Sequence, residues 1–239
     1  MVAVAAAGWS APARADQFTP AQRAEIVSIV RNALKTDPTI LGDAITALRA
    51  DAARKEDAAN ADALRDNPAA LSPQPGDIVR GDGDARTTLV EFYDPRCPYC
   101  RKVLPDLDAL LAGRRDLKLV EKIIPILGPD STVDARAIQA AIRQNKGLEM
   151  QQALMTDHGK GLDHVREAAA KLGLDWTRLQ SDMGSAAVKQ ELERNIALAH
   201  AINLTGTPTF IAGRQVLPGA ASLAELRALV DQATPPTAR

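Results

Sequence analysis

The chain contains two cysteines, Cys97 and Cys100, which are separated only by Pro98 and Tyr99. Two thiols this close can hold a metal ion, form a structural disulfide or exchange electrons with other thiols. A tetrahedral zinc site needs four ligands, and the three histidines of the chain are scattered without the spacing of a ligand pair. The ligand count therefore argues against zinc, and the sequence predicts no metal site.

A structural disulfide between these cysteines would contribute little. Such a bridge stabilises a fold by closing a loop, and the benefit grows with the length of that loop. Closure across two residues restrains the unfolded chain very little, so redox exchange is the more favoured use of the pair.

The elements around the cysteines support redox exchange. Residues 87–93 (TTLVEFY) predict a buried strand, and residues 101–111 are helical in composition with a kink expected at Pro105. The pair thus lies where a strand ends and a helix begins, as in thioredoxin-like C-x-x-C motifs. The unpaired N–H groups and the dipole of the helix N-terminus stabilise a thiolate, which makes Cys97 the candidate nucleophile. Cys100 lies on the same helix face and is the candidate resolving thiol.

Two more features are candidates for the same site. Glu91 lies in the apolar strand, on the face opposite its two neighbours and beneath the helix. A buried carboxylate there would have a raised pKa and could accept the proton of the resolving thiol; the alternative is an exposed strand carboxylate. Thr207-Pro208 precedes a predicted strand, which indicates a turn or a cis bond, with trans as the alternative.

The predicted elements continue beyond the cysteine pair as a second strand, a block of helices and a ββα unit. A strand at 117–127 implies a right-handed βαβ unit with parallel strands. The remaining elements are helices within about 133–200, a hairpin of residues 209–213 and 215–217, and a helix from Ser222 to about Gln232.

The first 15 residues, MVAVAAAGWSAPARA, predict a signal peptide. A short apolar stretch is followed by Ala13-Arg14-Ala15, a small-x-small pattern that suits signal peptidase. The alternative is a disordered Ala-rich N-terminus. Export would place the protein in an oxidising compartment, where disulfide chemistry is common.

Residues 16–67 predict an N-terminal helical segment. Thr19 and Gln22 match a capping box, with Pro20 at the first helical position. An apolar stripe at helical spacing follows, and a second stripe begins after Asp37-Pro38.

Residues 68–77 contain three prolines and a glycine, which is typical of a linker. The preceding stretch, 52–67, reads as a solvated helix or a hinge. Two amphipathic helices separated from a domain cannot bury their stripes alone. They either fold back onto the domain or associate with other copies, so residues 19–66 are a candidate homo-oligomerisation segment.

Several stretches together resemble the DsbA-like family of thioredoxin-fold thiol–disulfide oxidoreductases. The resemblance covers about residues 75–235. It implies an α/β fold, with a thioredoxin domain at 78–235, a helical insertion at about 133–200 and the amphipathic helices in front. The stretches that carry it are 91-EFYDPRCPYC-100, 101-RKVLPDL-107, 124-IPILGPDS-131 and 205-TGTPTF-210.

The resemblance also implies roles for individual residues. Thr207-Pro208 would be cis and would face the cysteines, where its backbone pairs with the substrate chain. Glu91 matches the buried acid of the family, six residues before the first cysteine. Pro98 and Tyr99, between the cysteines, complete the predicted substrate-binding residues.

The dipeptide departs from that of DsbA, which has Pro-His where this chain has Pro98-Tyr99. With Thr207 before the proline, the chain looks more similar to DsbG-type and ScsC-type members. ScsC-type proteins carry an N-terminal helical oligomerisation segment, which residues 19–66 resemble. This likeness adds isomerase or reductase activity, or an association with copper stress, to the options.

The leading hypothesis is a periplasmic thiol–disulfide oxidoreductase that needs no cofactor, because the electrons reside on the two sulfurs. Its expected partners are cysteine-containing exported proteins and a membrane redox partner that recycles it. The formal net charge of −1 argues against a nucleic-acid partner. The alternatives are a Cu(I)-binding thiol module and a non-catalytic chaperone or interaction module.

Overall fold

A computed structural model describes residues 18–157 and 159–234, so the predicted signal peptide lies outside the described residues. The chain forms two compact units, Met1–Lys55 and Glu56–Arg239. Each unit is described by itself.

The first unit holds helix α1 (Pro20–Thr36) and the start of α2 (Thr39–Asp66). The predicted capping box is confirmed: the Thr19 N–H donates to Gln22 Oε1 at 2.8 Å, and the Gln22 N–H donates to Thr19 Oγ1 at 3.3 Å. The interruption at Asp37-Pro38 is also present, since a new helix begins at Thr39.

The apolar side chains of this unit are exposed. No described residue of α1 is buried. Among the described residues, no helix combines the length and the apolar character needed to cross a membrane. In the described part of this unit, from residue 18 onward, the exposed large apolar residues are Phe18, Ile26, Val27, Ile29, Val30, Leu34, Ile40, Leu41, Ile45 and Leu48.

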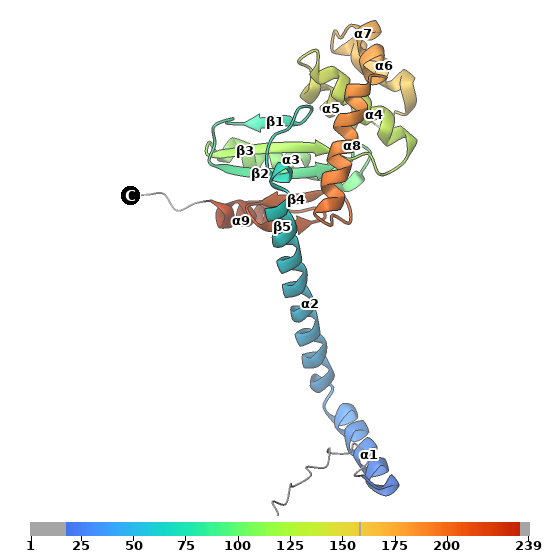
Figure 1. Cartoon of the computed structure of the whole chain (residues 1–239), viewed down its shortest axis with the longest axis vertical. Coiled ribbons are helices and arrows are strands. Elements are labelled where there is room, and N and C mark those ends of the chain that lie inside the picture. The colour runs from blue at the N-terminus through green and yellow to red at the C-terminus, as the bar shows by residue number, and fades with distance from the viewer. Residues whose placement is uncertain (1–17, 158, 235–239) are drawn as a thin grey trace, which may run out of the picture. The chain divides into compact units, whose positions relative to one another are not determined.

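A five-stranded sheet organises the second unit, with the strand order β1-β3-β2-β4-β5 (Figure 1). β2 and β3 are parallel and are joined by helix α3 (Pro98–Gly113), which confirms the predicted βαβ unit. The other strand pairs are antiparallel. The strands are β1 (Ile78–Gly81), β2 (Thr87–Tyr93), β3 (Leu117–Ile123), β4 (Thr209–Ala212) and β5 (Gln215–Pro218).

The structure refines the predicted strand boundaries. β3 ends at Ile123 rather than at residue 127, and Pro125, which lacks a backbone donor, follows shortly after. β1 was not predicted, because it spans only Ile78–Gly81 and has little apolar alternation. The hairpin prediction is confirmed, with Gly213 at the turn in the left-handed region (φ 60°).

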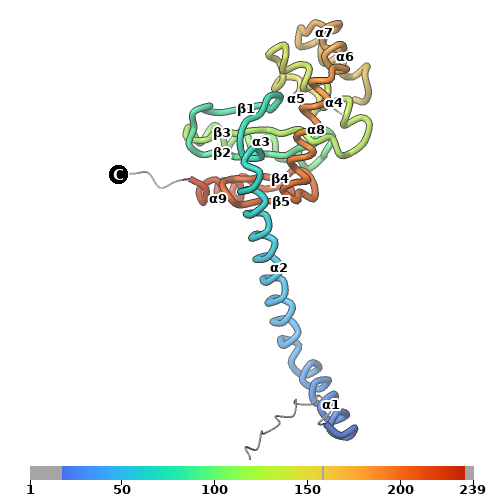
Figure 2. Tube along the Cα trace, viewed as in Figure 1, coloured from blue at the N-terminus to red at the C-terminus, as the bar shows by residue number. Residues whose placement is uncertain are grey.

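Helices cover both faces of the sheet. One face packs against α3 and α9 (Leu223–Ala233) through residues such as Leu89, Leu107 and Leu229. The other face packs against the end of α2 and against α8 (Ala186–Ala201) through Leu64, Val90 and Ala199. In Figure 2 the C-terminal hairpin and α9, at the red end of the colour range, lie beside β2. This places chain segments that are distant in sequence around the parallel strands.

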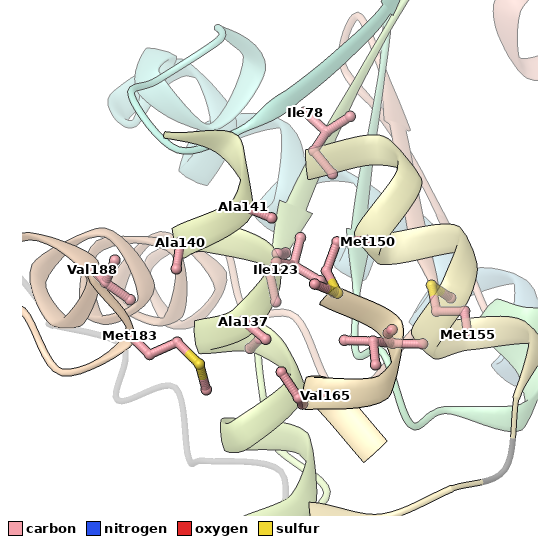
Figure 3. Close-up of a cluster of buried hydrophobic side chains, with 14 of the residues drawn as sticks. Ile78, Ile123, Ala137, Ala140, Ala141, Met150, Met155, Val165, Met183 and Val188 are labelled. Carbon is pink, nitrogen blue, oxygen red and sulfur yellow. The ribbon is translucent and has the colours of Figure 1, made fainter. Parts of the chain in front are cut away.

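A block of helices lies beyond the ends of β2 and β3 (Figure 1). It packs on Tyr93 and Ile123, the last residues of these strands, and on both cysteines. Small residues let the helices approach closely: Figure 3 shows Ala137, Ala140 and Ala141 of α4 among Ile123, Met150, Val165 and Val188. The block consists of α4 (Pro129–Ile142), α5 (Gly147–Thr156), α6 (Gly161–Lys171), α7 (Trp176–Met183) and α8.

The predicted linker at 68–77 is part of the second unit and packs against its sheet. A 3-10 helix, η1 (Pro68–Leu71), follows α2, and Ala70 is fully buried. α2 is helical through to Asp66, so residues 52–66 form a helix rather than a hinge, and its last residues belong to the second unit. The composition of this segment suggested a linker, but prolines also occur in short turns that pack on a sheet.

Lys122 and Asp77 hold this segment to the sheet. Lys122 Nζ lies 2.5 Å from Asp77 Oδ2 and donates to the Ser72 carbonyl at 2.9 Å. Both charged side chains are fully buried. The Gly76 carbonyl accepts a 2.7 Å hydrogen bond from Gln139 of α4. The segment is therefore tied both to β3 and to the helical block.

Removing one partner of this ion pair should destabilise the second unit. Asp77→Ala leaves the Lys122 ammonium buried without a counter-charge, and we expect a loss of about 3–5 kcal/mol in the free energy of unfolding by urea. The double variant Asp77→Ala/Lys122→Met removes both charges and should recover part of that loss. Equal stabilities of the double and the single variant would contradict this account.

Candidate active site

Cys97 is the N-cap residue of α3, directly after the turn that leaves β2. Its backbone N–H donates to the Asp94 carbonyl at 3.0 Å, which fixes the turn. Its side chain is 4% exposed, and the thiol donates to the Thr207 carbonyl at 3.2 Å. The cysteine pair and the distant 205–210 segment therefore meet at one point.

The two thiols have opposite protonation preferences. The pKa of Cys97 is lowered to about 5, first by a hydrogen bond with the Cys100 thiol and then by the Thr207 side chain and the backbone N–H groups at the start of α3. Burial raises the pKa of Cys100, and both Cys97 and the Glu91 carboxylate raise it further. Cys100 is fully buried. At neutral pH the site thus presents a thiolate at Cys97 and a thiol at Cys100.

The Thr207-Pro208 peptide bond is cis, as the resemblance implies. The loop is held by its own backbone: the Pro208 carbonyl accepts from Gly219 N–H at 2.8 Å, and the Thr209 hydroxyl donates to the Gly206 carbonyl at 2.8 Å. With the Thr207 carbonyl on the Cys97 thiol, this loop forms one wall of the site.

Glu91 is 1% exposed, so the prediction of a buried carboxyl is confirmed and the exposed alternative is wrong. Burial raises the pKa of Glu91 well above its ordinary value, and the neighbouring Glu121 carboxyl raises it further. Glu91 also interacts electrostatically with Cys97 and Cys100. Its position beneath α3 suits proton exchange with the thiols.

Asp94 has a positioning role that the sequence analysis did not identify. Its buried carboxylate accepts hydrogen bonds from the Arg96 N–H at 2.7 Å, from the Ile126 and Leu127 N–H groups at 2.8 and 2.9 Å, and from the Ser131 hydroxyl at 2.8 Å. It thereby joins the active-site turn to the loop between β3 and α4. The sequence contained one indication of this role. Asp94 directly follows the predicted strand, and an aspartate side chain often accepts a hydrogen bond from the backbone N–H two residues further on.

Two arginines fix the active-site turn to the helical block. Arg96 Nε lies 2.7 Å from Oδ2 of Asp134, whose side chain is fully buried in α4. Arg101, in the first turns of α3, donates to the Pro95 carbonyl at 3.2 Å and to the Leu154 carbonyl at 3.3 Å. Sequence alone could not show the contacts of Arg101 with Pro95 and Leu154, because their acceptors are backbone carbonyls.

The surface around Cys97 is apolar and exposed. Pro98 is exposed and Tyr99 is 61% exposed, so the dipeptide between the cysteines lies at the surface. Ile126 and Leu127, whose backbone is bound to Asp94, are 49% and 53% exposed. Pro98 and Tyr99 are therefore accessible, whereas Thr207 is half-buried and Pro208 is buried. Ile126 and Leu127 are exposed apolar residues that the sequence analysis did not select.

The site brings together every residue that was predicted for it: Cys97, Cys100, Glu91, Pro98, Tyr99, Thr207 and Pro208. The chemistry it supports is nucleophilic attack of a thiolate on a disulfide, followed by attack of a second thiol held in reach. Within the described residues, no group of three or more His, Cys, Asp or Glu side chains is arranged to hold a metal ion.

Comparisons with solved structures agree with this architecture. A thioredoxin-like oxidoreductase from Silicibacter pomeroyi is 34% identical, with a TM-score of 0.66 over 70% of this chain and 97% of that one. ScsC from Proteus mirabilis, in a transitional conformation, is 26% identical, with a TM-score of 0.64 over 90% of this chain and 96% of that one. Both likenesses support the predicted α/β thioredoxin fold with its helical insertion.

Among curated proteins, the Na(+)/H(+) antiporter NhaA of Herminiimonas arsenicoxydans is 36% identical over 143 residues. The match covers 59% of this chain and 23% of the antiporter, so this chain spans less than a quarter of the length of that relative.

Family models match two regions of the chain. Residues 22–55 match the N-terminal domain of the copper resistance protein ScsC. Residues 88–231, which include the two cysteines and the cis-proline loop, match the DSBA-like thioredoxin domain. The chain belongs to the DSBA-like thioredoxin domain family.

Proposed function

We propose that this protein is a thiol–disulfide oxidoreductase that acts on the cysteines of exported proteins. The observation that carries the proposal is the placement of Cys97: a thiol of lowered pKa, at a helix N-terminus, 3.2 Å from the carbonyl that precedes a cis-proline. The family to which the chain belongs supports the same reaction.

In the proposed reaction, the Cys97 thiolate attacks a substrate disulfide and forms a mixed disulfide, or a substrate thiolate attacks the Cys97–Cys100 disulfide at Cys97. The substrate chain lies along the Thr207-Pro208 backbone, over the exposed Tyr99. Cys100 then forms or leaves the bond to Cys97, with Glu91 exchanging the proton. No cofactor takes part, because the two sulfurs carry both electrons.

The pKa of Cys97 favours the oxidising direction. A thiolate that is stable at neutral pH stabilises the reduced protein, so the protein gives up its disulfide readily. Oxidation or isomerisation of substrates is therefore favoured over reduction. Such work fits an oxidising compartment, and we place the protein in the periplasm, delivered by the signal peptide predicted in residues 1–15 and recycled by a membrane redox partner.

The N-terminal segment supports self-association. Its exposed apolar residues form a stripe that includes Ile26, Val27, Val30 and Leu34 on α1. An amphipathic helix gains stability by burying such a stripe against another element. We propose that residues 19–66 associate with other copies of the chain, which would gather several active sites in one assembly.

Serine variants test the roles of the two cysteines. Cys97→Ser should abolish insulin reduction, because it removes the nucleophile. Cys100→Ser should retain attack but accumulate mixed disulfides, visible as covalent adducts by non-reducing electrophoresis. Normal insulin-reduction turnover by Cys97→Ser would refute the assignment. If both cysteines proved dispensable for the role of the protein, the chaperone alternative would be favoured.

The stability of the reduced protein should depend on pH through Cys97. Its folded pKa is about 5 and its ordinary value is 9.0, so the unfolded state binds more protons between these values. The stabilisation is complete above pH 9.0 and is lost as the pH falls through about 5. Cys100, whose pKa is raised, stays protonated over this range.

Urea unfolding of both redox forms measures this effect. The stability of the reduced form relative to the oxidised form should fall by about 2 kcal/mol from neutral pH to pH 5. Titrations of carboxyls remote from the two cysteines are common to both forms and cancel in the comparison. A difference that does not change with pH would contradict the lowered pKa.

Charged substitutions on α1 test self-association. The full-length protein should sediment as an oligomer, and Val27→Glu/Val30→Glu should sediment as a monomer because both side chains belong to the exposed stripe. Asn32→Glu, at an exposed polar position of the same helix, is the matched control and should remain oligomeric. A monomeric wild-type protein would contradict the proposal.

A further inference from the structure

Glu121 lies beside Glu91 in the sheet, and the mechanism above leaves it without a role. The two residues are register partners in the parallel β2–β3 ladder, so their side chains leave the same face of the sheet about 4.8 Å apart. Both are buried, at 0% and 1% exposure. Two carboxylates this close in a medium of low polarity cannot both be ionised.

Unpartnered oxygens show that the pair has capacity left for a proton. Among the described residues, Glu91 Oε1 and Glu121 Oε2 have no hydrogen-bond partner. The other oxygen, Glu121 Oε1, accepts from Gln151 Nε2 at 3.0 Å. Buried polar atoms are usually paired, so these two oxygens mark a place where a proton can be held.

Glu121 contacts Arg80 and Gln151, which line a surface pocket, whereas Glu91 interacts electrostatically with the thiols. Arg80 Nη1 is 3.9 Å from Glu121 Oε1, and the same guanidinium pairs with Asp108 on the exposed side of α3. Arg80, Asp108 and Gln151 line a pocket of about 430 Å³ that opens to the surface. Glu121 is thus linked to this pocket through two of its lining residues, and Glu91 lies close enough to the thiols to raise the pKa of Cys100.

We infer that Glu121 is a proton-relay residue, which acts through Glu91 by taking up the proton of the resolving thiol and passing it to water in the pocket beside Arg80. This inference rests on the proposed function and adds to it the route by which the proton leaves the protein.

The step balances in protons and electrons. Cys100 gives its proton to ionised Glu91, and its thiolate attacks the Cys97 sulfur of the mixed disulfide. The Cys97–Cys100 bond forms, the bond from Cys97 to substrate breaks, and its electron pair leaves on the substrate thiolate. Because Glu121 already holds the one proton of the pair, it first releases that proton to water, and the proton on Glu91 then moves to Glu121, which leaves Glu91 ionised again. In the reverse direction the pair supplies the proton that the departing Cys100 thiolate needs.

The charges around the pair are consistent with this role. The pKa of Glu121 is raised by burial to about 7, with Arg80 and Gln151 opposing the rise and Asp108 adding to it. The pKa of Glu91 is raised by burial, by Glu121 and by Cys97, and lowered by Arg80. The pair therefore exchanges a proton close to neutral pH, and its two titrations belong to the pair as a whole.

Reaction of the full-length reduced protein with 5,5′-dithiobis(2-nitrobenzoate) separates the two thiol steps. The first release of thionitrobenzoate reports attack by Cys97, and the second reports resolution by Cys100. Glu121→Gln should leave the first phase unchanged and slow the second by about tenfold at neutral pH. The midpoint of the second phase against pH should also move to lower pH, because Glu91 loses the neighbour that raises its pKa.

Control variants and the wild-type protein make the test decisive. Glu193→Gln, which removes an exposed carboxylate on α8, should change neither phase. Glu91→Gln should slow the second phase by about a hundredfold. If Glu121→Gln matches the wild type in rate and midpoint, the relay is wrong. If the wild type itself shows no second release, the proposed function fails instead.

Infrared spectroscopy of the wild-type protein gives a measurement that does not depend on the variants folding. A band from a buried protonated carboxyl should disappear with a midpoint near pH 7. Its absence on the acid side of that midpoint would overturn the inference.

Discussion

The Asp94 carboxylate, buried at the end of β2, accepts hydrogen bonds from two separate loops, and each loop carries part of the active site. One is the turn that leads into Cys97, and the other holds the exposed Ile126 and Leu127. A single buried group that satisfies several backbone N–H groups leaves neither loop free to move alone. The nucleophile and the apolar surface beside it are therefore positioned by the same contact.

The asymmetry of the two thiols follows from this positioning. A helix begins at Cys97, so its sulfur meets unpaired N–H groups, whereas Cys100 lies one turn deeper and is fully enclosed. The same three-residue step along a helix thus produces one thiol that prefers to ionise and one that resists it. The two carboxyls beneath α3, Glu91 and Glu121, are also buried, and burial raises the pKa of each.

Sequence patterns predicted the parts of the site that depend on local chemistry. The C-x-x-C spacing, the strand before it and Glu91 within that strand follow from periodicity and helix-end electrostatics, and the structure brings them together. Glu121 could have been found in the same way, because strand alternation places it on the same face of β3 as Leu119 and Ile123. Pairing it with Glu91, however, requires the register between two strands, which the sequence does not specify.

Other features depended on contacts that no local pattern encodes. Residues 68–77 have the composition of a linker, yet Lys122 and Gln139, which are far away in sequence, turn that segment into part of the fold. Arg101 donates to the carbonyls of Pro95 and Leu154, and every residue has a backbone carbonyl. The composition of these segments is compatible with more than one structure, and their tertiary contacts determine which structure forms.

The complete burial of Cys100 also affects how the site withstands chemical damage. A peroxide in the surroundings meets Cys97 first, and the product of that encounter is a sulfenic acid. A thiol already held against it condenses with the sulfenic acid, releases water and forms the same disulfide that turnover forms. The enclosed cysteine therefore protects its partner from irreversible oxidation, and an oxidative injury ends as an ordinary state of the reaction cycle.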